Sequence, residues 1–224
     1  MTTLRNSFEG GSNGTGISVI NSGGGSGDAF SYLSGTPTFS NAHAKSGSLS
    51  ASLPGGSFSS LGYNLSATDI WLRYYLWISS NSDSVTVARI YTSAGGSGSL
   101  LGTLRMDPTR ALYIDCGTGS DLIFGPVATS QWVRFEAKWS TTTGGEVRLY
   151  NSADSDTPTG SATVSSNMTG AAASIELIHV GSTLVSYFID DYAVSTDGWI
   201  GPSLDAGPRS PLISRTAAQR ASRW

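Results

Sequence analysis

The stretch TDIWLRYYLWIS, residues 68–79, carries the clearest β-strand pattern in the chain. One set of alternate positions is apolar or aromatic: Ile70, Leu72, Tyr74 and Leu76. The other set is Trp71, Arg73, Tyr75 and Trp77. Because successive side chains of a strand point to opposite faces, the pattern predicts a strand with its first face in a core.

Shorter alternating runs fill the rest of the chain up to residue 202, separated by clusters of Gly, Ser, Asn and Asp. We count roughly a dozen candidate strands, which is too many for one flat sheet and suits two packed sheets. The chain has 224 residues, of which 38% are hydrophobic and only 13% charged, so a real core is expected. We therefore predict an all-β fold, an antiparallel β-sandwich (jelly roll).

The character of the sequence changes at residue 203. Residues 1–202 are predicted to form the jelly-roll domain, and residues 203–224 an extended, basic C-terminal arm. The residues of the arm expected to bind a partner are Arg209, Arg215, Arg220, Arg223 and Trp224. The arm cannot build a core alone, so it is expected to be disordered or ordered by a partner. Trp199 in the preceding turn is expected to hold the arm against the sandwich.

Composition argues against several other classes of protein. The net charge is -3, which is not typical of a nucleic-acid-binding protein. There is no apolar run long enough for a transmembrane helix, so no membrane role is expected. The first residues lack the pattern of a signal peptide, which predicts synthesis in a cytoplasm without secretion by that route. Cys116 is the only cysteine, so no intrachain disulfide is expected.

Several motifs together resemble a known fold family. They are NSFEGG (6–11), NSGGGSGDAF (21–30), W-x-R-x-Y-x-W (71–77), QWVRFEAKW (131–139), FIDDYAVS (188–195) and GWIGP (198–202). Over residues 4–202 the chain resembles the concanavalin A-like lectin/glucanase jelly roll of the laminin-G-like kind. More narrowly, it is similar to jelly-roll proteins in virions and prophages of actinobacterial bacteriophages. The resemblance implies that the last strand, residues 188–195, pairs beside the first, residues 4–10.

This resemblance implies a non-enzymatic structural protein of a bacteriophage virion, made in the host cytoplasm. It would be a surface subunit of the capsid or tail, held by its C-terminal arm. Its expected partners are other virion proteins and further copies of itself, because such parts are commonly homo-oligomers.

The alternative function is a carbohydrate-binding module for host cell-wall glycans. Trp71, Arg73, Tyr75 and Trp77 are the candidate glycan-binding residues, because flat aromatic rings stack on the apolar faces of sugars. A different interpretation is that these side chains belong to the core, or that the arm or a neighbouring subunit covers them. An open tryptophan face would favour glycan binding, and a covered face would favour a structural subunit.

The adjacent acids Asp190 and Asp191 raise the question of a metal site. In a regular strand they point to opposite faces, so both cannot enter one small site. We expect one to face solvent and the other to accept hydrogen bonds, with no cofactor. Calcium is the rival interpretation, because the resemblance implies acids at the sheet rim, and such a site needs six to eight oxygen ligands.

A glycoside hydrolase is the third functional class. Retaining glycosidases need two carboxyl groups about 5 Å apart. The family's glucanases carry them as an E-x-D-x-x-E or E-x-D-x-E run, which is absent here. Glu136 is the best single candidate, although an exposed charged strand face is the simpler interpretation. His43, His179 and Cys116 lack metal-ligand spacing, so we predict no enzyme activity.

Overall fold

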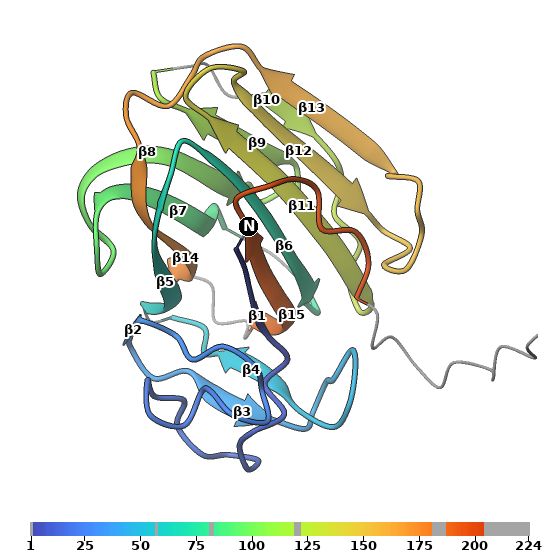
Figure 1. Cartoon of the computed structure of the whole chain (residues 1–224). Coiled ribbons are helices and arrows are strands. Elements are labelled where there is room, and N and C mark those ends of the chain that lie inside the picture. Colours follow the sequence, from blue (N-terminus) through green and yellow to red (C-terminus); the bar gives the residue numbers. More distant parts are fainter. Residues whose placement is uncertain (1, 57, 81–82, 119–121, 181–186, 204–224) are drawn as a thin grey trace, which may run out of the picture.

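The fold is an antiparallel β-sandwich, as predicted. The computed structural model describes residues 2–56, 58–80, 83–118, 122–180 and 187–203, and the arm from residue 204 onward lies outside them. Within this part of the chain all regular structure is β-strand, in two sheets packed face to face (Figure 1). None of the elements described is a helix that would cross a membrane.

Neighbouring strands in each sheet are hydrogen-bonded in an order far from the chain order. The eight-stranded sheet runs β13 (Gly160–Val164), β12 (Gly145–Tyr150), β11 (Trp132–Ser140), β6 (Asp69–Trp77), β15 (Tyr187–Ser195), β4 (Ser50–Leu53) and β3 (Thr38–Ser40), with β1 (Thr3–Asn6) also pairing with β15. The seven-stranded sheet runs β10 (Leu122–Phe124), β9 (Leu112–Cys116), β8 (Ser97–Met106), β7 (Val85–Ser93), β14 (Ala172–Val180), β5 (Ser59–Ala67) and β2 (Tyr32–Ser34). The crossovers between sheets are typical of a jelly roll.

The first and last described strands lie side by side, as the resemblance implies. Leu4 of β1 pairs with Val194 of β15, and Asn6 pairs with Tyr192. Figure 1 shows β1 and β15 adjacent in the eight-stranded sheet. Backbone hydrogen bonds therefore join the first strand of the chain to the last described one. This pairing brings the N-terminal loops next to the segment that follows β15.

The core fills the space between the sheets. Ile70, Leu72, Tyr74 and Leu76 of β6 are at most 1% exposed, which confirms the predicted inner face of this strand. Around β6, aromatic residues from both ends of the chain join the core, and Phe30 and Tyr192 stack with ring centroids 5.9 Å apart. Trp139 of β11 is fully buried, and its indole Nε1 donates a hydrogen bond to the Asp115 carbonyl at 2.9 Å.

Strand β6 lies between β11 and β15 and so positions the candidate site. Its Trp77 is opposite Trp132 of β11 and Phe188 of β15. Four residues earlier, Arg73 is opposite Glu136 of β11. Side chains that alternate with the buried ones therefore form rows across three strands on the far side of the sheet from the core.

Candidate functional site

The candidate site lies on the outer face of the eight-stranded sheet, the side turned away from the seven-stranded sheet. Because the alternate residues of β6 are in the core, Trp71, Arg73, Tyr75 and Trp77 share this outer face. Tyr75 and Arg73 are 0% and 3% exposed, whereas Trp71 and Trp77 are half-buried. The four candidate glycan-binding residues therefore lie together but do not form one open aromatic surface.

The two tryptophans of β6 have different surroundings. Trp77 stacks on the His43 ring, with centroids 3.5 Å apart, and meets the edge of Phe188 at 5.7 Å. Trp71 has the Lys138 ammonium 5.6 Å from its ring centroid. Trp77 is thus enclosed by other rings, whereas Trp71 lies beside Lys138, whose ammonium also donates to the Thr143 hydroxyl at 2.6 Å.

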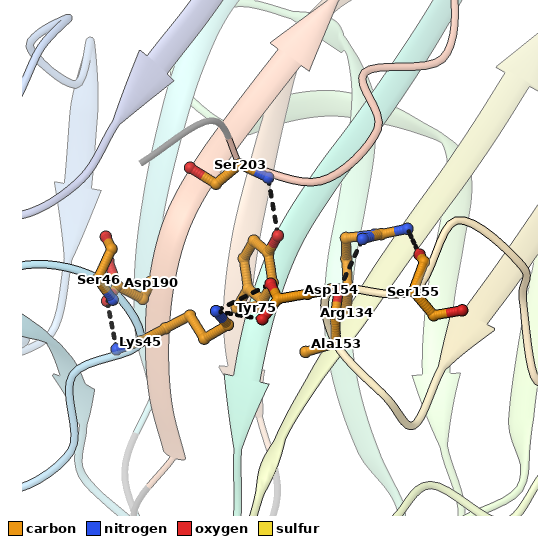
Figure 2. Close-up of polar contacts among 9 residues, drawn as sticks. All are labelled: Lys45, Ser46, Tyr75, Arg134, Ala153, Asp154, Ser155, Asp190 and Ser203. Atoms are coloured by element: carbon orange, nitrogen blue, oxygen red, sulfur yellow. Dashed lines mark hydrogen bonds and ion pairs between the residues drawn. The ribbon is translucent and has the colours of Figure 1, made fainter. Parts of the chain in front are cut away.

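Tyr75, between them, is covered from two directions. The Lys45 ammonium lies 5.1 Å from the Tyr75 ring centroid, and an ion pair of 2.9 Å with Asp154 holds that lysine in place. The backbone N–H of Ser203 donates a hydrogen bond to the Tyr75 hydroxyl at 2.8 Å. Figure 2 shows the tyrosine between these two groups. Segments distant in sequence therefore close over the centre of the face.

A second buried row lies on β11 and β12. The Arg134 guanidinium donates to the carbonyl oxygens of Ala153 and Ser155, both at 2.7 Å (Figure 2), and stacks 3.7 Å from the Tyr150 ring centroid. Its Nε is also 3.1 Å from Glu136 Oε1, in an ion pair without hydrogen-bond geometry. These contacts use most of the donors of Arg134, so it serves to anchor the loop after β12.

Glu136, the best catalytic candidate from sequence, is only 1% exposed, so the interpretation of an exposed charged face was wrong. Burial raises the pKa of the Glu136 carboxyl, and the positive charges of Arg134, Arg148 and Arg73 oppose that rise. Its direct cross-strand neighbours are Arg148 on β12 and Arg73 on β6. The carboxylate is therefore the negative centre of an arginine cluster.

The segment after β15, residues 196–203 (here the exit segment), crosses this outer face. In Figure 1 it runs from the end of β15 in front of the sheet. The Trp199 ring lies 3.6 Å from the Arg148 guanidinium, and Ser203 reaches Tyr75 as described above. Trp199 thus holds the exit segment on the sandwich, while the arm beyond residue 203 lies outside the described residues.

The aspartate pair lies at an irregularity in β15. Asp190 is opposite Tyr75 and Ala193 is opposite Arg73, so β15 carries one residue more than β6 between these pairs. Asp191 adopts a φ of 46°, which is unusual outside glycine and occurs at bulges. The two carboxylates therefore do not alternate as in a regular strand, and both lie toward the outer face.

The prediction that one aspartate faces solvent was also wrong, because Asp190 and Asp191 are 0% and 4% exposed. Asp190 Oδ2 accepts hydrogen bonds from the backbone N–H groups of Lys45 at 2.8 Å and Ser46 at 3.1 Å (Figure 2). Burial and the charge of Asp191 raise the pKa of Asp190 to about 8, and these amide hydrogen bonds oppose the rise.

The surroundings of Asp190 bear on the calcium interpretation. Calcium is bound by six to eight oxygen atoms, whereas the groups around Asp190 Oδ2 are N–H donors. Within the described parts of the chain, no three His, Cys, Asp or Glu side chains are grouped as metal ligands would be. The described residues fit a hydrogen-bonded carboxylate better than a calcium ligand, and the expectation of no cofactor stays a prediction.

A polar cavity of about 290 Å³ opens on the outer face beside Asp191. Its walls are β1, the glycine-rich turn of residues 24–27, β6, β15 and Ser203. Three charged side chains line it: Arg5 from β1, Arg73 from β6 and Asp191 from β15. Sequence analysis selected Arg73 and Asp191 separately but missed Arg5, because only the pairing of β1 with β15 brings it to this place.

The glycine-rich turn is held by hydrogen bonds at both of its ends. The Asn6 amide donates to the carbonyl oxygens of Ser22 at 2.6 Å and Asp28 at 2.9 Å. Gly27 has a φ of 113°, and a Cβ there would lie 2.5 Å from the Arg5 carbonyl oxygen. Only glycine fits this close approach, so the turn forms a defined wall of the cavity.

Arg73 is the most unusual group of the cavity. Its Nε and Nη1 are buried and have no hydrogen-bond partner among the described residues. Burial lowers the pKa of its guanidinium; Asp191 raises it and the like charge of Arg5 lowers it further. Because leaving a buried charged donor without an acceptor is costly, Arg73 makes the cavity a candidate ligand site.

The remaining sequence candidates do not join this site. Arg209, Arg215, Arg220, Arg223 and Trp224 lie outside the described residues. His43 packs on Trp77, whereas His179 Nδ1 contacts the Pro54 carbonyl at 3.1 Å. Cys116 is buried, with its Sγ 3.8 Å from the Ser140 carbonyl oxygen.

Comparison with known proteins gives the fold alone. No protein-family model matches the chain, and no curated protein sequence matches it significantly. Among solved structures it is similar to cellulose-induced protein Cip1, with a TM-score of 0.60 and 15% identity over 89% of this chain and 100% of that one. The binding domain of botulinum neurotoxin serotype G gives a TM-score of 0.54 and 10% identity over 91% of this chain and 48% of that one.

A bacteriophage protein has a related fold. The carbohydrate esterase of the Shiga toxin-encoding bacteriophage phi24B gives a TM-score of 0.50 and 13% identity, over 74% of this chain and 89% of that one. At these identities the likeness shows a β-sandwich of the jelly-roll kind. It does not carry the activity of any of these proteins over to this chain.

Proposed function

We propose that this protein is a non-enzymatic carbohydrate-binding β-sandwich. The observation that carries the proposal is the polar cavity, whose walls combine charged side chains with a glycine-rich turn next to a half-buried tryptophan. Saccharides are bound by a few well-placed polar groups together with an aromatic platform. Solved structures of similar fold include proteins described as cellulose-induced and as a carbohydrate esterase, which supports the same class of ligand.

The proposed binding surface extends along strand β6. Arg73 faces the cavity, and Trp71 lies two residues along on the same face, about 7 Å away at the usual rise of a strand. One sugar residue is held in the cavity, and the next stacks on Trp71 after Lys138 moves aside. In this proposal Tyr75 is covered by Lys45 and Trp77 is covered by His43, so neither ring contacts the sugar.

The absence of enzyme activity is part of the proposal. Glu136, the candidate acid, is in an ion pair with Arg134 and lies opposite two further arginines. A carboxyl group that is buried and already paired with a guanidinium is closed off from a substrate, which makes it a poor general acid. We therefore assign Glu136 to the internal charge balance of the sheet, and expect Glu136→Gln to leave any glycan binding in place.

A glycan array probed with the full chain tests this function. Wild-type protein is expected to bind a subset of the glycans, and Trp71→Ala to weaken that binding several-fold through loss of stacking. Tyr113→Ala, which removes a half-buried aromatic side chain from the seven-stranded sheet, serves as the matched control and retains binding. Absence of binding to every glycan by the wild type would refute the function.

The second candidate is a surface subunit of a bacteriophage virion, in the capsid or the tail. The observation that favours it is the basic arm, because no acidic residue follows Asp205 and four arginines do. In this proposal the arm binds a sister copy or another virion protein, and the cavity faces outward to host glycans. The exit segment, which precedes the arm, ends at Ser203 on the outer face, where the Ser203 N–H donates to the Tyr75 hydroxyl.

Antibody-gold labelling of gradient-purified particles from the source culture tests the virion proposal. Gold on the shell or on the tail supports it and identifies the part. Particles without gold, while the free protein still binds glycans, would refute the virion role and leave the carbohydrate-binding function intact. Replacing all four arm arginines with alanine is expected to abolish the labelling without unfolding the sandwich.

A further inference from the structure

We propose that the polar cavity binds a sugar residue that carries a carboxylate, such as a uronate, with Arg73 and Arg5 on the anionic group. This inference rests on the proposed carbohydrate-binding function and names its class of ligand. It concerns the cavity of about 290 Å³ beside Asp191, and not the aromatic row selected from sequence.

The buried arginine supplies the first argument. Arg73 lines the cavity although it is only 3% exposed, and its buried Nε and Nη1 have no hydrogen-bond partner among the described residues. The guanidinium remains charged at any physiological pH and presents parallel N–H groups that match the two oxygens of a carboxylate. A neutral hydroxyl group supplies only one acceptor oxygen for these parallel N–H groups, so it leaves one of the Arg73 donors without a hydrogen bond.

The charge balance supplies the second argument. Arg5 and Arg73 line the cavity together, and Asp191 is the only acidic side chain that lines it in the described structure. Nearby acids are engaged elsewhere: Glu136 is paired with Arg134, and Asp28 Oδ2 accepts the backbone N–H of Arg5 at 2.8 Å. The cavity therefore has a net charge of about +1, which a ligand with one negative charge neutralises.

The dimensions of the cavity supply the third argument. A volume of about 290 Å³ lies at the lower limit of small-molecule sites, which suits one sugar residue and not a longer chain. The wall at residues 24–27 is mostly glycine, and a Cβ at Gly24 would meet no atom within 4 Å. The bare backbone leaves space for the ring of the sugar, and the Asp191 carboxylate lines the same cavity.

Isothermal titration calorimetry with matched ligands tests the inference. The full chain is titrated with methyl β-D-glucuronide, with methyl β-D-glucoside, which lacks only the carboxylate, and with sodium acetate, which lacks the sugar. We expect the glucuronide to bind at least about tenfold more tightly than either of the others, the effect of one charge-assisted contact.

Two variants locate the binding. Arg5→Ala removes an exposed guanidinium and is expected to weaken glucuronide binding about tenfold. Arg105→Ala removes one arginine from the seven-stranded sheet, changes the net charge equally and is expected to leave the affinity unchanged. Arg73→Lys keeps the positive charge but loses the parallel N–H groups of the guanidinium. Circular dichroism checks that this variant is folded before it is titrated.

Each other outcome overturns the inference in a distinct way. Equal affinity for glucuronide and glucoside removes the anionic specificity but leaves the carbohydrate function in place. Equal affinity for acetate and glucuronide means an adventitious anion only. Failure of all sugars here and on the glycan array refutes the proposed function itself.

Discussion

At the scale of single residues, His179 shows how burial becomes a dependence of stability on pH. It is 0% exposed on β14, and its Nδ1–H donates to the Pro54 carbonyl. Burial lowers the pKa of this imidazole below its ordinary value of about 6.5, while the hydrogen bond to Pro54 opposes the change. The folded protein therefore holds His179 neutral at pH values where the unfolded chain binds a proton.

The sign of the effect follows from proton binding. Below about pH 6.5 the unfolded chain takes up a proton that folded His179 does not, so His179 costs stability as the pH falls, by at most about 1.4 kcal/mol per pH unit. His179→Asn keeps an N–H donor and cannot titrate. We measure the free energy of unfolding of both proteins in urea at pH 7, 6 and 5. The wild type is expected to lose stability relative to the variant as the pH falls from 7 to 5. A difference that is constant with pH would contradict this.

Gly102 is a residue whose identity is fixed by its neighbour. A Cβ at this position of β8 would lie 2.5 Å from Cδ1 of the buried Trp139 ring. Because Trp139 is also hydrogen-bonded to Asp115, the ring has little freedom to move. Gly102→Ala is expected to lower the free energy of unfolding by about 1–3 kcal/mol, the usual cost of overpacking.

The control for this change is Gly170→Ala, where a new Cβ would meet no atom within 4 Å. Its effect is expected to stay within about 0.5 kcal/mol. Urea unfolding followed by tryptophan fluorescence measures both variants. Equal stabilities of the two would show that the sandwich relaxes around Trp139 and that the ring is not rigidly held.

At the scale of elements, the exit segment covers part of the outer face of the eight-stranded sheet. Its Trp199 stacks on Arg148, and Arg148 Nε donates to Glu146 at 2.7 Å, so the stack belongs to an ordered charge pair. A double-mutant cycle of Trp199→Ala and Arg148→Met measures the contact by urea unfolding. We expect a coupling energy of about 0.5–2 kcal/mol, and additive effects would mean that the stack contributes nothing.

The sequence predicted some elements well and others poorly, for physical reasons. The strand of residues 69–77 was evident because its inner face is uniformly apolar. Strand β5 was missed because Ser59, Ser60 and Gly62 occupy buried positions on it, which hides the alternation. Gly62 is required there: a Cβ would lie 2.2 Å from the Tyr32 ring, which packs across the strand from β2.

The candidate site was predicted only in part. The shared face of Trp71, Arg73, Tyr75 and Trp77 followed from strand alternation, but nothing local to β6 indicates that Lys45 and Ser203 cover Tyr75. The alternation rule also failed for the aspartate pair, because one extra residue in β15 shifts Asp191 toward Arg73. Bulges depend on partner strands, so they are not visible in a single segment of sequence.

At the scale of the whole molecule, the topology predicts slow and cooperative folding. Strand β15 pairs with β1, β4 and β6, and β14 pairs with β5 and β7, so both sheets depend on contacts between distant parts of the chain. A single hydrophobic core joins the two sheets: it includes Trp139 of β11 from the eight-stranded sheet and Leu104 of β8 from the seven-stranded sheet. Neither sheet has a buried face of its own without the other.

We therefore expect one unfolding transition in urea, with the same midpoint by far-ultraviolet circular dichroism and by tryptophan fluorescence. Refolding is expected on the order of milliseconds to seconds or slower, because closing long loops must precede the contacts that stabilise them. Arg5→Ala, at the rim of the cavity, is expected to change neither the midpoint nor the refolding rate appreciably, which separates binding from folding. Refolding faster than a millisecond would contradict the prediction of slow folding. Loss of the β-sheet circular dichroism signal before the tryptophan fluorescence changes would contradict cooperative unfolding.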